Sequence, residues 1–319
     1  MLTRKWLVAS FVLIALGAIV FTLSACSSGG NLSDLLSPEY STKELVISED
    51  FDSIVIDVTT ADIRLAASDD GECRLVSFSH DKVKVGAIVG AGTLTVSFED
   101  EREWYDHIAV FTNSPALTLY LPEAQYETLV VEATTGDIEL PAGFTFGTVD
   151  ISLSTGDVEL ESSVTGLAKV ETTTGDIELE NISASSIALE VTTGDVSLSN
   201  VDCGGNISIV IGTGDTYLTD VTCYNFTSDG TTGKESLVDV IASGKITITR
   251  TTGDITLERS DASELEITTS TGDVRGILLT PKIFIAESST GRIDVPKTSE
   301  GGVCKVTTST GDIKLDIAK

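Results

Sequence analysis

The sequence predicts an all-β protein, a parallel β-helix or β-solenoid of about ten coils of 19–20 residues. A Thr-Gly pair recurs ten times at regular spacing between Thr135 and Gly311, with 19 or 20 residues between successive glycines. Apolar and polar residues alternate on both sides of each glycine, as in strands with one buried face. A repeat this short cannot bury its apolar side alone, so the copies are expected to stack.

The first 26 residues resemble a bacterial lipoprotein signal. Two basic residues precede the apolar run Trp6–Leu23, and a Leu-Ser-Ala-Cys box ends at Cys26, which would carry the lipid. An uncleaved membrane-spanning helix is the alternative, because a run of 18 residues is close to the minimum span. Both alternatives anchor the chain in the membrane and place residues 27–319 on its outer side.

Irregular β coils are expected before the regular stack. We expect a Ser/Gly-containing tether over residues 27–44 and irregular coils over residues 45–125. Thr59–Leu65 is a decayed copy of the repeat in which Ala61 takes the place of the glycine. Further strands are predicted at residues 74–78, 82–88, 93–98 and 116–121.

The regular repeat occupies residues 126–319. In one copy, Ala168 and Val170 precede the glycine by seven and five residues, and Ile177 and Leu179 follow it by two and four. These two apolar sets are out of phase, so the chain must bend at the glycine, which accepts a positive φ. The threonine before each glycine is expected to point inward and to form a ladder of hydroxyl groups.

An aspartate follows most of these glycines and is the most conspicuous candidate for chemistry. Stacking would place the carboxylates in a column with a spacing of about 4.8 Å, where like charges repel. They are expected either to cap the turns through backbone hydrogen bonds or to hold a ladder of Ca²⁺ ions. The candidates are Asp137, Asp157, Asp176, Asp195 and Asp215.

One segment interrupts the repeat pattern. Residues 99–113 contain Trp104, Tyr105 and His107 among acidic residues. These aromatic side chains could form a binding loop for a sugar or a peptide, or they could fill the end of the solenoid core.

Two cysteines occupy equivalent positions in adjacent copies. Cys203 and Cys223 each follow their glycine by nine residues, which places their Cα atoms within disulfide range in a stacked fold. A disulfide and a pair of small buried thiols are both compatible with this placement. Cys73 and Cys304 are expected to be unpaired core residues, and no cysteine–histidine spacing indicates zinc.

The charge balance excludes some classes of function. The chain has 20 Lys plus Arg against 49 Asp plus Glu, a formal net charge of −29, so a nucleic-acid partner is not expected. His80 and His107 are the only histidines, which leaves little for histidine-based catalysis. We expect no cofactor, with Ca²⁺ as the one alternative.

The motifs together resemble a bacterial family of unknown function that is labelled putative adhesin. The resemblance rests on Phe51–Ile54, Ala61–Ile63, Leu117–Pro122 and the Thr-Thr-Gly-Asp repeats, and it covers residues 45–319. It implies a surface-exposed binding role and assigns no catalytic residue. The chain departs from the repeat at Lys234 and Arg292, which replace aspartate, and at Glu235, which takes an apolar position.

From these observations we expect a membrane-anchored, extracytoplasmic β-solenoid without enzymatic activity. It would serve as an adhesin or envelope component whose ligand is an unidentified surface glycan or protein. A carbohydrate-active β-helix enzyme and an accessory protein of envelope-stress signalling are the alternatives. A unique pair of acidic residues in a groove would favour the enzyme.

Overall fold

The computed structural model describes residues 40–80, 83–100 and 115–318. All 26 regular elements of this part are β-strands, which confirms the all-β prediction. It contains no helix long and apolar enough to span a membrane. The expected signal or anchor helix, with Cys26, lies outside the described residues. Strand β1 (Tyr40–Ile47) begins inside the segment expected to be tether, so that boundary was predicted too late in the chain.

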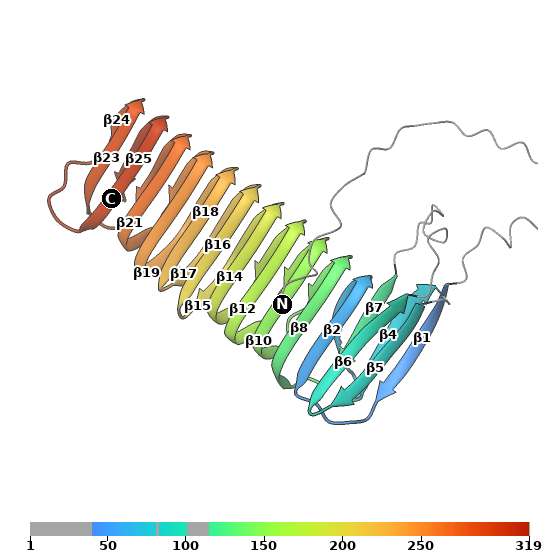
Figure 1. Ribbon diagram of the computed structural model, residues 1–319. Coiled ribbons are helices and arrows are strands. Elements are labelled where there is room, and N and C mark those ends of the chain that lie inside the picture. Colours follow the sequence, from blue (N-terminus) through green and yellow to red (C-terminus); the bar gives the residue numbers. More distant parts are fainter. Residues whose placement is uncertain (1–39, 81–82, 101–114, 319) are drawn as a thin grey trace, which may run out of the picture. The chain divides into compact units, whose positions relative to one another are not determined.

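The regular part is a stack of coils, and each coil contributes one strand to each of two walls (Figure 1). Strands before the Thr-Gly corner form the first wall: β8 (Gln125–Thr135), β10 (Thr145–Thr155), β12 (Ser163–Thr174), β14 (Ser183–Thr193), β16 (Asn206–Thr213) and β18 (Asn225–Thr232). Strands after it form the second wall: β9 (Ile138–Leu140), β11 (Val158–Leu160), β13 (Ile177–Glu180), β15 (Val196–Cys203) and β17 (Thr216–Cys223). The long strand β19 (Glu235–Thr252) belongs to both walls. All these strands pair in parallel with the neighbouring coil.

A second corner follows β13 and lies within the longer strands β15, β17 and β19. Residues six positions after the glycine have φ between 50° and 56° in five successive coils. They are Asn181, Asn200, Asp220, Asp239 and Arg259. Asparagine and aspartate tolerate this left-handed conformation better than most residues. The Nδ2 of Asn200 also donates to the Oδ1 of Asn181 at 2.7 Å, so this corner carries a polar ladder of its own.

The core lies between the walls, at the positions the alternation predicts. Ala168, Val170, Ile177 and Leu179 are all 0% exposed. The prediction of an inward threonine ladder is wrong, because the threonine before each glycine, such as Thr174, is exposed. The chain is already turning at this threonine, so its side chain leaves the buried row that the strand parity would assign to it.

The N-terminal coils are stacked out of sequence order. The predicted copy with Ala61 forms β2 (Ser53–Thr60) and β3 (Asp62–Ala67), which pair in register with β8 and β9. Beyond it lie β6 (Thr93–Asp100) and β7 (Ala116–Leu121), again in parallel. The outermost strands β5 (Val83–Gly90), β4 (Cys73–His80) and β1 pair antiparallel, which the sequence did not predict.

The two ends of the stack differ in shape. At the N-terminal end the first wall runs from β2 through β6 to β5, and the second wall runs from β3 through β7 and β4 to β1. The second wall is therefore one strand longer, and this end is stepped. At the C-terminal end both walls finish with the same coil, and the return connection of residues 295–301 contacts that coil, since the hydroxyl of Thr298 donates to the carbonyl of Lys282.

The last two coils of the chain have exchanged places. After β20 (Ile255–Glu258), the coil β21 (Asp261–Thr271) and β22 (Val274–Leu278) pairs with β25 (Gly302–Thr310) and β26 (Ile313–Ile317), the final coil of the sequence. The preceding coil, β23 (Lys282–Thr290) and β24 (Ile293–Asp294), lies outside it at the end of the stack (Figure 1). Residues 295–301 make the return connection.

Candidate binding surface

The Thr-Gly-Asp corners are held together by two kinds of hydrogen bond between coils. At one corner the N–H of Gly175 donates to the carbonyl of Thr193 at 3.0 Å. Gly175 has φ +135°, and a Cβ there would lie 1.9 Å from the carbonyl oxygen of Gly156. Only glycine therefore allows the backbones of successive coils to approach this closely.

The aspartates form a ladder in which each carboxylate accepts a backbone N–H from the next coil. The Oδ1 of Asp157 accepts the N–H of Asp176 at 2.7 Å, and Asp176 accepts the N–H of Asp195 at 2.7 Å. The same bond joins the other candidates, so Asp137, Asp157, Asp176, Asp195 and Asp215 do lie in one column. These hydrogen bonds stabilise a row of like charges that would otherwise repel.

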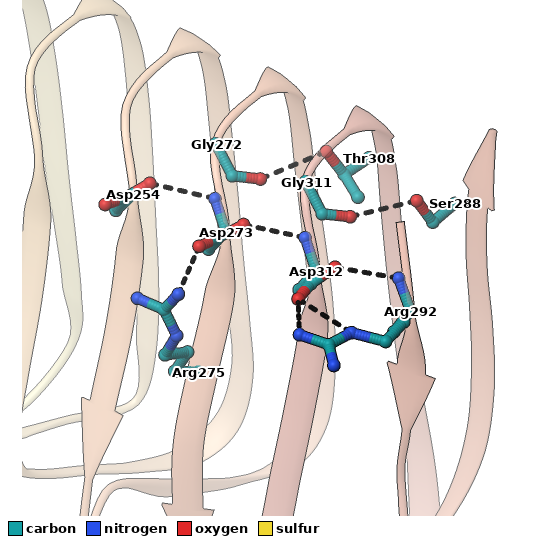
Figure 2. A network of polar contacts seen from close by, with 9 residues as sticks. All are labelled: Asp254, Gly272, Asp273, Arg275, Ser288, Arg292, Thr308, Gly311 and Asp312. Atoms are coloured by element: carbon teal, nitrogen blue, oxygen red, sulfur yellow. Dashed lines mark hydrogen bonds and ion pairs between the residues drawn. The ribbon is translucent and has the colours of Figure 1, made fainter. Parts of the chain in front are cut away.

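Each run of aspartates ends at a basic residue. Asp215 accepts the N–H of Lys234 at 2.7 Å, and there the first run stops. The second run passes from Asp273 to Asp312 and ends at Arg292, whose N–H lies 2.8 Å from the Oδ1 of Asp312 (Figure 2). The Arg292 guanidinium also bonds the Oδ2 of Asp312, and these contacts lower the pKa of that carboxyl group.

The hydrogen bonds of the aspartate column are those expected if the carboxylates cap the turns. One oxygen of each candidate is used by a backbone N–H, which leaves few oxygens to surround a cation. Among the residues that the structure describes, no group of three or more His, Cys, Asp or Glu side chains could hold a metal ion. Calcium binding remains a prediction that a melting experiment can test.

A groove crosses the outer side of the first wall near its N-terminal end. Its volume is about 490 Å³, and it crosses strands β2, β8, β10, β12 and β14. One row of its lining stands four residues before the corner residue, which is Ala61 in the first coil and glycine in the others: Asp57, Glu132, Ser152, Glu171 and Glu190. A second row, two residues nearer the corner, carries the hydroxyl groups of Thr134, Ser154, Thr173 and Thr192. We call this feature the acid–hydroxyl groove.

The second wall carries a separate column of acidic residues on its outer side. Glu139, Glu159 and Glu178 are register neighbours in β9, β11 and β13. Arg64 ends the column with an ion pair of 3.0 Å to Glu139. Partial burial and the neighbouring carboxylates raise the pKa of Glu159.

A buried ion pair lies inside the solenoid next to the break at Lys234. The Oε2 of Glu235 is 2.8 Å from the Nη2 of Arg250, and both side chains are 0% exposed. Ser228 donates to Glu235 at 3.0 Å, and Arg250 donates to the hydroxyl of Thr216 at 2.6 Å. Burial raises the pKa of Glu235 to about 7, although the Arg250 charge and hydrogen bonds oppose the shift.

A glycine makes room for this arginine. A Cβ at Gly230 would lie 1.4 Å from the Nη1 of Arg250, so no larger residue fits beside the guanidinium. Sequence reasoning singled out Glu235 as a departure but missed Arg250 and Gly230. The signal was available, because Arg250 stands three residues before its glycine, where other copies place apolar residues such as Val191 and Ile211.

The four cysteines that the structure describes are buried and unpaired. Cys203 and Cys223 lie in adjacent coils as expected, since Asp202 pairs with Thr222 one position earlier. They are drawn as thiols in the structure, and the disulfide stays a prediction that labelling can test. Burial raises the pKa of the Cys223 thiol to about 12. Trp104, Tyr105 and His107, the candidate binding loop, lie outside the described residues.

The fold and this surface define a class of protein: a parallel β-solenoid whose outer walls carry columns of repeated polar side chains. The chain belongs to the family described as Toastrack DUF4097, whose model matches residues 51–215 and 203–319. None of the curated proteins compared with the sequence matches it.

Similar solved structures align over most of both chains but have low sequence identity to this one. A putative adhesin from Bacteroides fragilis NCTC 9343 is 14% identical with a TM-score of 0.47, covering 89% of this chain and 99% of its own. A putative adhesin from Parabacteroides distasonis ATCC 8503 is 11% identical with a TM-score of 0.49, covering 88% and 98%. A putative lipid binding protein from the same strain is 15% identical with a TM-score of 0.42, covering 86% and 96%.

Proposed function

We propose that this protein is an extracytoplasmic, membrane-anchored and non-enzymatic adhesin or envelope component that binds its ligand along the acid–hydroxyl groove. One observation carries the proposal: four of the five neighbouring coils that line the groove contribute a carboxylate at the same position, and four contribute a hydroxyl group two residues nearer the corner. Such a surface suits an elongated ligand with repeated units rather than one small substrate. The names of the similar structures, putative adhesins from two organisms, agree with this role.

The groove chemistry indicates a ligand that carries positive charge and hydrogen-bond donors. Asp57, Glu132, Glu171 and Glu190 present carboxylates, and among these Glu171 is already paired with Lys169 at 2.8 Å. The ligand is therefore a basic protein segment or a glycan with amino groups. Attraction between exposed charges weakens with salt, so binding should weaken as ionic strength rises.

The absence of enzymatic activity is part of the proposal. The carboxylates of the groove stand at repeat-equivalent positions, whereas an active site needs a unique cluster that breaks the repeat. The membrane anchor is supported by the apolar run and the box ending at Cys26. If the anchor is a lipid, Cys26→Ser should abolish lipidation and leave a larger, uncleaved precursor; if the anchor is an uncleaved helix, the size of the protein should not change.

Binding can be tested with the full chain in lipid nanodiscs. The probes are a lysine-rich polypeptide, a deacetylated amino-sugar polymer and a neutral glucan. The triple variant Glu132→Gln, Glu171→Gln and Glu190→Gln should lose at least tenfold in affinity for the cationic probes. The matched control Glu139→Gln, Glu159→Gln and Glu178→Gln removes the same charge from the second wall and should bind like the native chain. Equal loss in both variants, or preference for the neutral glucan, would contradict the groove as the binding site.

A further inference from the structure

The C-terminal end of the stack has open strand edges. Strand β23 pairs only with β25, and β24 pairs only with β26, among the residues that the structure describes. Their outer backbone N–H and C=O groups therefore have no strand partner in this part of the chain. An edge of this kind is a template for pairing with another strand.

The core is only partly covered at this end, where Val295 of the return connection packs against it. Ile293 is 45% exposed, whereas Ile313, at the same position of the next coil inward, is 0% exposed. Phe284 is half-buried, whereas its equivalent Cys304 is fully buried. The last coil thus exposes apolar side chains whose equivalents in the interior coils are covered by a neighbouring coil.

Charge distinguishes this end from the rest of the chain. Residues 282–319 contain six basic and five acidic residues, a net charge of +1. The other 281 residues contain 14 basic and 44 acidic residues, a net charge of −30. Two copies of this chain would repel each other along most of their length, and this end is a place where they can meet without that repulsion.

We propose that the C-terminal end is a self-association surface on which two copies pair about a two-fold axis, β23 against β23 and β24 against β24. The second copy supplies an identical open edge and an identical half-exposed core, so that both are closed at once. Both walls of this end finish with the same coil and can pair together, whereas the stepped N-terminal end would leave β1 overhanging. Two-fold pairing is also closed, so it gives a dimer and not a filament.

Cross-linking in the full chain tests the arrangement. Ile285 is on the outer side of β23 and 46% exposed, and Ile88 on β5 at the other end is 74% exposed. With a short bis-maleimide, the variant Ile285→Cys should give a covalent dimer and the control Ile88→Cys should stay monomeric. Cross-links that form only when the two variants are mixed would show head-to-tail stacking and overturn the proposal. Protection of Ile285→Cys within a monomer would show that another segment of the chain covers this end, which also overturns it.

Sedimentation of the full chain in detergent micelles gives an independent measurement. The native chain should sediment as a dimer, Ile285→Lys should shift it to monomer, and Ile88→Lys should not, because only the former introduces like charges at the proposed axis. The membrane segment is common to all three proteins, so it does not explain a difference between them. A monomeric native chain, or equal masses for both variants, would refute the dimer.

Discussion

Glu235 and Arg250 form an ion pair of 2.8 Å in the interior of the solenoid, with both side chains fully buried. The Oε1 of Glu235 and the Nε and Nη1 of Arg250 have no hydrogen-bond partner there. Taking two charges out of water is costly, and incomplete hydrogen bonding leaves part of that cost uncompensated. Changes at this pair should therefore affect stability strongly, and two predictions concern it.

The first prediction concerns pH. Glu235 has a pKa of about 7 in the folded chain against the ordinary value of 4.5, so between these values the folded state holds a proton that the unfolded state has released. The free energy of unfolding should therefore fall by about 3 kcal/mol as the pH rises from about 4.5 to about 7. Above about pH 7 the contribution of Glu235 should no longer change with pH. Urea unfolding followed by circular dichroism would measure the slope. Glu235→Gln should remove it, and the exposed control Glu264→Gln should keep it; an unchanged slope in Glu235→Gln would contradict the assignment.

The second prediction concerns the pair as a unit. Arg250→Met leaves a buried carboxyl group without its partner and should cost about 3 kcal/mol of stability. The double variant Glu235→Leu with Arg250→Met replaces both charges by apolar groups, and its stability should return to within about 1 kcal/mol of the native chain or exceed it. A double-mutant cycle measured by urea unfolding gives the coupling. Additive losses in the two single variants would show that the charges do not act together.

The third prediction separates turn capping from cation binding at the aspartate column. Asp176→Asn keeps an oxygen that accepts the N–H of Asp195 and removes one repelling charge, so its stability should match or exceed that of the native chain. Asp176→Ala loses the acceptor and should cost about 1 kcal/mol. If the column instead binds Ca²⁺, the native melting temperature should rise in millimolar Ca²⁺ and fall in EDTA, and Asp176→Asn should lose that response.

The fourth prediction concerns the thiols. Burial raises the pKa of Cys73 to about 11 and that of Cys223 and Cys304 to about 12, so little thiolate is available for reaction. Alkylation of the folded chain by iodoacetamide should therefore be slow, and denaturation should expose all of them. Mass spectrometry without reductant counts the labelled residues. Two missing labels, at Cys203 and Cys223, would show that these residues are oxidised to a disulfide.

The fifth prediction concerns the space that Gly230 leaves for Arg250. Gly230→Ala introduces a Cβ that would lie 1.4 Å from the Nη1 of Arg250, so the guanidinium must move and its buried contacts must change. We expect a loss of about 2 kcal/mol. Gly90→Ala is the matched control, because nothing lies within 4 Å of a Cβ there. Equal stability of the two variants would show that the arginine can move without cost.

The spacing of the glycines predicted the coil length, the corner and the buried positions, because these depend on contacts that every copy makes in the same way. Even the decayed copy at Ala61 was identified, since β2 and β8 pair in the expected register, Thr60 opposite Thr135. The tether boundary failed because β1 pairs antiparallel with β4 across the chain, a contact that local composition does not encode.

The order of the coils at the two ends could not be predicted from the sequence, for a physical reason. All copies carry the same apolar positions and the same corner, so β21 could pair equally well with β23 or with β25, and the pattern does not distinguish them. The candidate surface was predicted in part for the same reason. The aspartate column follows from the repeat, whereas the acid–hydroxyl groove depends on which outward residues the stacking brings together.

The exchanged order of the last two coils has a consequence for fraying. In a stack built in sequence order, the terminal coil opens as a free chain end. Here the last strand, β26, is held between β22 and β24, and the coil that can detach is an internal loop tied at both sides. A loop that opens while its ends stay fixed gains less conformational entropy than a free tail. Strand β26 is thereby kept from leading local unfolding.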